Sequence, residues 1–61
     1  MSKISISRGN FKVELINHAQ GEPYVYIWEK VEGRPELELA CGFPKGDLGD
    51  LIKLLVELNE V

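Results

Sequence analysis

The chain has 61 residues, a net charge of −3 and a single cysteine, and these properties exclude several classes of protein. A chain this short buries only about 60% of the surface that its unfolded form exposes, so small domains usually need disulfides, a metal or a partner subunit. The lone Cys41 forms no internal disulfide, and the lone His18 falls short of the roughly four ligands of structural zinc. We therefore expect no metal, no cofactor, and self-association as the remaining source of stability.

The first twelve residues, MSKISISRGNFK, lack the apolar run and the small-residue cleavage site of a signal peptide. The sequence has no run of about 18 apolar residues, so we expect no membrane span. A free thiol is typical of proteins in a reducing compartment. These features predict a cytoplasmic protein that does not enter a membrane.

Alternating apolar and polar residues predict two strands near the N-terminus, KISIS over 3–7 and FKVELIN over 11–17. Between them, Gly9 and Asn10 suit the positive φ angles of a tight hairpin turn. A two-residue loop there opposes residues of like character: Ile6 to Val13, Ile4 to Leu15, Ser7 to Lys12 and Ser5 to Glu14. Apolar pairs then share one face and polar pairs the other, so pattern and register agree.

The rest of the sequence predicts two more strands and a helix. HAQGEP (18–23) reads as a connecting loop, roughly 24–31 as the third strand, EGRP as a turn and ELELACGF (36–43) as the fourth strand. PKGDLGDLIKLLVELNEV reads as a helix, and we expect Asp47 to be its N-cap. The predicted fold class is α+β, a single domain over 1–61 in which a four-stranded antiparallel meander precedes one C-terminal helix (ββββα).

The segment PYVYIWEK has apolar side chains on both alternating faces, the aromatic residues Tyr24, Tyr26 and Trp28 on one and the aliphatic residues Val25 and Ile27 on the other. The next turn decides which set enters the core. A two-residue turn at Glu32-Gly33 buries the aromatic residues, with Trp28 opposite Leu37. A three-residue turn that ends in a left-handed Gly33 buries the aliphatic residues instead. We favour the first arrangement because three aromatic side chains bury more area; apolar residues remain on the far face either way.

The predicted helix has more apolar surface than one sheet can cover. At about 100° per residue its apolar positions sweep roughly 220°, whereas a surface helix needs a stripe of about 100°. Leu54, Leu58 and Val61 lie at one edge of this arc. We expect these three residues to form a homodimer interface. The alternative is a frayed last turn that leaves Val56 and Val61 in water.

Few residues suggest a catalytic or phosphate-binding site. A Cys–His nucleophile needs both side chains within hydrogen-bond reach and an orienting group, and nothing predicts this for Cys41 and His18. Cys41 lies in a predicted strand, where a cysteine usually packs as a small hydrophobic residue. We expect a solvated acidic surface from Glu29, Glu36 and Glu38, and FPKGDLGD lacks the spacing of a phosphate loop. We therefore expect no catalytic residue and no enzymatic activity.

Charge is distributed unevenly along the chain. Lys3, Arg8 and Lys12 are the only charged residues among the first twelve, whereas the remainder carries four basic and ten acidic side chains. The hydroxyl groups and cations of the first hairpin are suited to contact phosphates. Solvent exposure explains them equally well, and Glu14 shares their face. An acidic body with a basic tip is compatible with nucleic-acid and protein partners.

The aromatic strand YVYIWEK, the EGRP turn after it and the segment GFPKGDLGDLIKLL resemble the positive-cofactor-4-like transcriptional coactivators of whirly-type architecture. Those proteins have a curved four-stranded sheet followed by a helix, dimerise through their helices and bind single-stranded nucleic acid on their sheets. Their lysine-rich segment before the last strand is replaced here by PELELAC. The resemblance implies nucleic-acid binding by Trp28, Lys30, Arg34 and the basic hairpin.

Two functions are therefore expected. The first is a small non-catalytic dimeric module that binds single-stranded nucleic acid or regulates transcription, through Lys3, Arg8, Lys12, Lys30 and Arg34. The alternative is a protein-binding inhibitor or adaptor that uses its apolar helix flank or a sheet edge. The acidic balance favours the alternative, whereas the basic tip and the resemblance favour nucleic acid.

Overall fold

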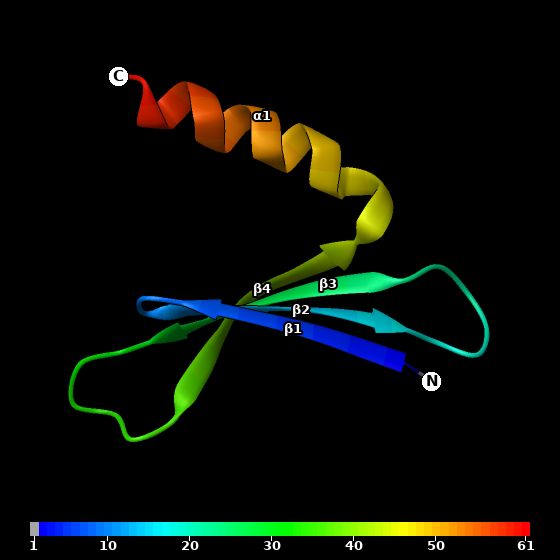
Figure 1. Cartoon of the computed structure of the whole chain (residues 1–61), viewed down its shortest axis with the longest axis horizontal. Coiled ribbons are helices and arrows are strands. Elements are labelled where there is room, and N and C mark those ends of the chain that lie inside the picture. The colour runs from blue at the N-terminus through cyan, green and yellow to red at the C-terminus, as the bar shows by residue number, and fades with distance from the viewer. Residues whose placement is uncertain (1) are drawn as a thin grey trace.

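Four antiparallel strands and one C-terminal helix make up residues 2–61, the part of the chain that the computed structural model describes. The strands β1 (Ser2–Arg8), β2 (Phe11–Asn17), β3 (Tyr24–Lys30) and β4 (Leu37–Pro44) form one sheet in the order β1-β2-β3-β4. A 3₁₀ turn (Lys45–Asp47) leads from β4 into the helix α1 (Leu48–Asn59), which crosses one face of the sheet (Figure 1). The predicted fold class is confirmed.

The first hairpin has the predicted register. All four expected pairs are present: Ile4 with Leu15, Ile6 with Val13, Ser5 with Glu14 and Ser7 with Lys12. Gly9 has a φ of 58°, but Asn10 does not have a positive φ. A positive φ at the first loop residue alone is typical of a type II′ turn. The prediction of two left-handed residues is therefore wrong for Asn10, since one glycine is enough to close this hairpin.

The register of β2 with β3 sorts the side chains onto two faces: Val13 lies opposite Ile27 and Leu15 opposite Val25, whereas Lys12 lies opposite Trp28 and Glu14 opposite Tyr26. We call the side of Val13 and Ile27 the helix face, because these two residues line one hollow together with Leu55 of α1. The opposite side, which carries Trp28, is the aromatic face. Val25 on the helix face is the only buried apolar residue among residues 2–61, at 2% exposure.

A β-bulge in β4 determines which side chains of this strand lie on each face of the sheet. On the N-terminal side of the bulge, β4 pairs with β3 as Leu37 with Lys30, Glu38 with Glu29 and Leu39 with Trp28. On its C-terminal side the pairs are Cys41 with Ile27, Gly42 with Tyr26, Phe43 with Val25 and Pro44 with Tyr24. The register shift leaves Ala40 without a partner, so the side chains of β4 change face there. Leu37 and Leu39 therefore lie on the aromatic face, whereas Cys41 and Phe43 lie on the helix face.

The connection between β3 and β4 is longer than predicted, and it corrects the expected core. Gly33 has a φ of 83° and the Arg34 N–H donates to the Val31 carbonyl at 3.0 Å. This combination is typical of a type II turn. The favoured two-residue turn is wrong, and so is the prediction that Trp28 is a core residue opposite Leu37. Trp28 is half-buried opposite Leu39, on the face away from α1.

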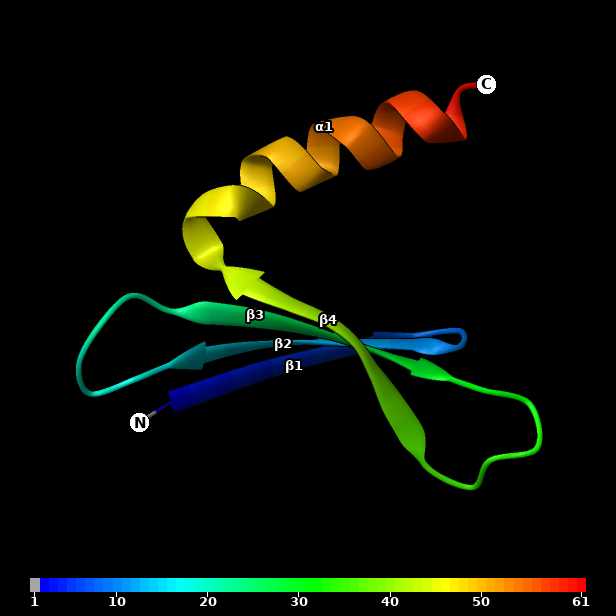
Figure 2. The same cartoon turned by 180° about the vertical axis from the view of Figure 1, so that it is seen from behind.

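Helix α1 diverges from the sheet toward its C-terminus (Figures 1 and 2). No residue of α1 is buried, and Cys41, which we expected to pack, is exposed because α1 does not cover it. Asp47 precedes α1 as predicted, but it has a helical φ of −88° and makes no capping hydrogen bond. The 3₁₀ turn already gives this residue a helical backbone, so its predicted capping role is wrong.

The chain is less compact than its length suggests. Its radius of gyration is 13.0 Å, the value of a compact domain of about 100 residues. It exposes 5121 Å², whereas a compact monomer of 6.9 kDa exposes about 4,000 Å². Exposed apolar side chains lie on the helix face and on α1 alike, among them Ile4, Ile6, Phe11, Ile52 and Leu55.

Candidate nucleic-acid interface

Three aromatic side chains, Tyr24, Tyr26 and Trp28, form a row along β3 on the aromatic face. Alternate residues of a strand lie about 6.7 Å apart on the same side, and the ring centroids of Tyr24 and Tyr26 are 5.8 Å apart with planes inclined by 32°. His18 lengthens the row, since its ring lies 6.4 Å from that of Tyr24. The three rings of β3 are half-buried, so each keeps part of its surface accessible to a ligand.

Gly42 of β4 gives the Tyr26 ring its position. The two residues are partners across the β3–β4 ladder. A Cβ atom at position 42 would lie 2.9 Å from Cδ1 and 3.0 Å from Cε1 of Tyr26. Because carbon atoms in contact are about 3.5–4.0 Å apart, any side chain at this position would displace the ring. A glycine is therefore required for Tyr26 to lie against β4.

The indole of Trp28 carries an unpaired donor. Its Nε1 atom is buried and has no hydrogen-bond partner among the described residues. Buried polar groups nearly always have a partner, and an unpaired one destabilises the fold. Because less than 1 Å² of this atom is exposed, a ligand acceptor would reach the N–H group only after the indole moves.

The structure brings three of the predicted cations to the aromatic face. Lys12 lies opposite Trp28, and its ammonium group is 5.4 Å from the centroid of the indole ring, within the range of a cation–π interaction. Lys3 and Lys30 occupy positions of the same face on β1 and β3. The aromatic row is therefore flanked by positive charge on several strands.

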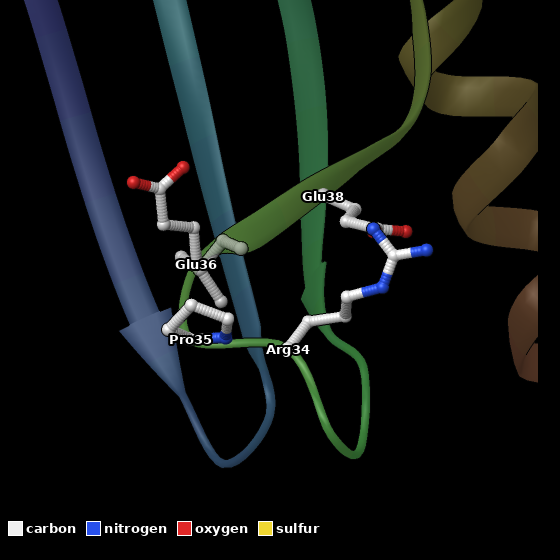
Figure 3. Close-up of a pocket in the computed structure, with 5 residues that line it drawn as sticks. Arg34, Pro35, Glu36 and Glu38 are labelled. Atoms are coloured by element: carbon white, nitrogen blue, oxygen red, sulfur yellow. The ribbon is translucent and has the colours of Figure 1, made fainter.

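The other two predicted cations lie elsewhere. Arg8 pairs with Phe11 at the end of the first hairpin, a position of the helix face. Arg34 lies in the β3–β4 loop, where its Nη1 atom is 3.1 Å from Oε1 of Glu38. Figure 3 shows these two side chains together, whereas Glu36 points away from them. The hollow that they line is small, about 150 Å³, and Arg34 is already paired with an acid.

Glu14 is the only buried acidic residue among residues 2–61, at 5% exposure. Its Oε2 atom accepts a hydrogen bond from the Ser5 hydroxyl at 3.1 Å, and the Nζ atoms of Lys3 and Lys12 are 3.3 and 3.9 Å away. Burial raises the pKa of this carboxyl, but hydrogen bonds from Lys3 and Ser5 and the charges of Lys12 and Lys3 outweigh that effect. The pKa of Glu14 therefore lies below its ordinary value.

An apolar hollow lies on the other side of the sheet, between α1 and the helix face. It has a volume of about 420 Å³ and is lined by Phe11, Val13, Ile27 and Leu55. On the same side, the predicted interface residues Leu54, Leu58 and Val61 are 62%, 68% and 103% exposed. Most of the exposed apolar surface therefore lies on the side opposite the aromatic row, although Leu37 and Leu39 are exposed beside that row.

Other kinds of site find no support in the described part of the chain. Residues 2–61 contain no cluster of three or more His, Cys, Asp or Glu side chains that could hold a metal ion. No helix in this range combines the length and the apolar character needed to cross a bilayer.

Comparisons with known proteins gave no significant match to a family model, a curated protein or a solved structure. The sequence predicted Tyr24 and Tyr26 in the core, so it did not predict the row of partly exposed rings on the aromatic face. The signal that points to them is Gly42, because a glycine inside a strand often marks a bulge or a close approach.

Proposed function

We propose that this protein is a small non-catalytic homodimer that binds single-stranded nucleic acid on its aromatic face. One observation carries the proposal: Tyr24, Tyr26 and Trp28 stand in a row beside Lys3, Lys12 and Lys30. Base–aromatic stacking contributes about 1–3 kcal/mol per base and tolerates any sequence, because every base has a π-face. Lysines beside the row supply phosphate contacts, which position the strand.

The spacing of the rings favours single strands over duplexes. The centroids of Tyr24 and Tyr26 are 5.8 Å apart, whereas successive nucleotides of a stacked strand rise by about 3.4 Å. Bases that stack on neighbouring rings must therefore separate from one another. Single strands allow this separation, whereas a duplex must first lose its own stacking and pairing.

The homodimer is proposed to form through α1 and the helix face. The excess of exposed surface over that of a compact monomer is about 1,100 Å² per chain, and a standard interface takes about 800 Å² from each partner. Leu54, Leu58 and Val61 are the proposed contacts from α1. Such a dimer covers the apolar side of each chain and leaves both aromatic faces free.

The cellular role that we propose is transcription regulation in the cytoplasm. The net charge of −3 works against a polyanion, so we expect moderate affinity that is sensitive to salt.

A fluorescence anisotropy titration tests the proposal. Labelled mixed-sequence oligonucleotides, single-stranded and double-stranded, are titrated at low and near-physiological salt. We expect a preference for single strands, with log K falling by about 0.7 per phosphate contact for each log unit of salt. Absence of binding at low salt would contradict the proposal and favour a protein partner for the apolar surface.

A pair of matched variants locates the site. Lys12→Ala combined with Lys30→Ala removes two positive charges from the aromatic face and should weaken binding and reduce the salt dependence. Lys45→Ala combined with Lys53→Ala removes the same charge from the region of α1 and serves as the control. Equal losses in both double variants would show that binding depends on net charge and not on the aromatic face.

A further inference from the structure

We propose that the Glu14 carboxylate competes with a phosphate group of the bound strand for the donors of one anion site on the aromatic face. This inference rests on the proposed function and adds a specific element to it. The donors of the site are Ser5, Lys3 and Lys12. Glu14 thereby limits the affinity of the aromatic face for single strands.

The geometry around one oxygen atom supports an anion site. A hydroxyl group and two ammonium groups, from two different strands, converge on Oε2 of Glu14 at 3.1, 3.3 and 3.9 Å. Hydroxyl and ammonium groups are also common donors to phosphate oxygens. The site therefore offers a phosphate the same donors that it now offers the carboxylate.

Exposure to solvent differs between the two lysines and the acid. The side chains of Lys3 and Lys12 are 59% and 32% exposed, whereas that of Glu14 is 7% exposed. Exposed ammonium groups on long flexible stems can turn outward to a phosphate, but the buried carboxylate cannot follow them. Each lysine that turns to the ligand therefore gives up part of its attraction to Glu14.

Lys12 connects the anion site to the aromatic row. Its Nζ atom lies 3.9 Å from Oε2 of Glu14 and 5.4 Å from the ring centroid of Trp28. A phosphate that Lys12 contacts therefore belongs to a nucleotide close to Trp28. The competition therefore affects the same nucleotide that can stack on Trp28.

A positioning role for Glu14 predicts the opposite sign. If the carboxylate served to hold the two lysines ready for the ligand, its loss would weaken binding. If it competes with phosphate, its loss frees both lysines and strengthens binding. The sign of the change in affinity therefore separates the two roles.

The test compares Glu14→Gln with Glu29→Gln in the anisotropy titration. Both substitutions remove one negative charge, but Glu29 lies opposite Phe11 and Glu38, on the helix face. We expect Glu14→Gln to bind single strands roughly threefold to tenfold more tightly at low salt, since the local repulsion is removed. Its salt dependence should steepen by about 0.7, the value of one further phosphate contact. Glu29→Gln should change affinity by less than about twofold, because the charge that it removes is distant and screened.

A second pair of variants tests the same site in case Glu14→Gln does not fold. Ser5→Ala removes one donor of the anion site without changing the charge, and should weaken binding by about threefold, as loss of one hydrogen bond does. Ser2→Ala, on the helix face of the same strand, is its control. Unchanged or weaker binding by a folded Glu14→Gln would overturn the inference, and so would unchanged binding by Ser5→Ala. If the wild-type chain still binds single strands, the proposed function is left intact. Failure of the wild-type chain and of Glu14→Gln to bind would overturn both.

Discussion

At the scale of single residues, the aromatic face is a connected chain of charge and ring contacts. Ser5 and Lys3 of β1 contact Glu14 of β2, and Lys12 joins that carboxylate to Trp28 of β3. A buried carboxylate is tolerated because each of these partners stabilises its charge. The contacts link three strands through side chains, in addition to the backbone ladders.

The lowered pKa of Glu14 predicts a dependence of stability on pH. Because its pKa is lower in the folded chain than in the unfolded chain, its contribution to stability is present above the unfolded value. That contribution is lost as the pH falls below about 4 and then through the pKa of Glu14 in the folded chain. Urea unfolding between about pH 2 and 7 should therefore show a steeper decline for wild type than for Glu14→Gln. The same decline in both proteins would contradict the assigned ion pairs.

Substitution of Gly42 tests whether the position of the Tyr26 ring matters for binding. Gly42→Ala places a Cβ atom 2.9 Å from that ring, and the displaced ring should lose stacking energy of about 1 kcal/mol or more. Gly49→Ala is the control, because a Cβ atom at position 49 has no neighbour within 4 Å. Anisotropy titration measures both, with thermal unfolding as a check of the fold. Equal affinity of the two folded variants would show that the Tyr26 ring takes no part in binding.

At the scale of elements, the hairpin of β1 and β2 was predictable and the pairing of β4 was not. In the hairpin, turn chemistry and the alternating pattern indicate the same register, so no alternative competes. In β4 the alternation of ELELACGF continues without a break in the sequence. The unpaired Ala40 nevertheless shifts every later residue to the other face. Alternation alone does not reveal where a bulge falls.

The error about the aromatic residues has a physical cause of its own. We favoured burial of Tyr24, Tyr26 and Trp28 because three aromatic side chains bury more area than two aliphatic ones. Helix α1 diverges from the sheet instead, so it gives little cover to the face beneath it. Among the described apolar residues only Val25, on that face, is buried. Alternation along the first hairpin places Lys3 and Lys12 on the aromatic face, whereas Arg8 occupies a position of the opposite face.

A substitution on α1 tests the proposed interface. Leu54 is 62% exposed in the single chain, so in a dimer it contributes apolar area that Leu54→Glu replaces with an unpaired buried charge. We expect wild type at micromolar concentration to have twice the chain mass by light scattering, and Leu54→Glu to be a monomer or unfolded. Lys53→Glu, at the neighbouring polar position, should remain a dimer. A wild-type monomer would contradict the interface.

At the scale of the whole molecule, the two faces of one thin sheet have different proposed tasks. The chain measures 35 × 31 × 15 Å, so it is little more than a sheet with a helix on one side. In the proposed homodimer, the apolar side supplies the association that a 61-residue chain needs for stability. The aromatic side would then remain free for the proposed ligand, and the dimer would present two copies of it.

The assignment of binding to one face is the central claim, and an NMR titration tests it most directly. The ¹⁵N-labelled protein is titrated with an unlabelled single-stranded oligonucleotide, and changes in amide and indole shifts are mapped by residue. We predict that the largest changes occur at Lys3, Lys12, Tyr24, Tyr26 and the Trp28 indole N–H, with little change along Leu48–Asn59. Shift changes confined to α1 and the helix face, or no changes at all, would contradict the account.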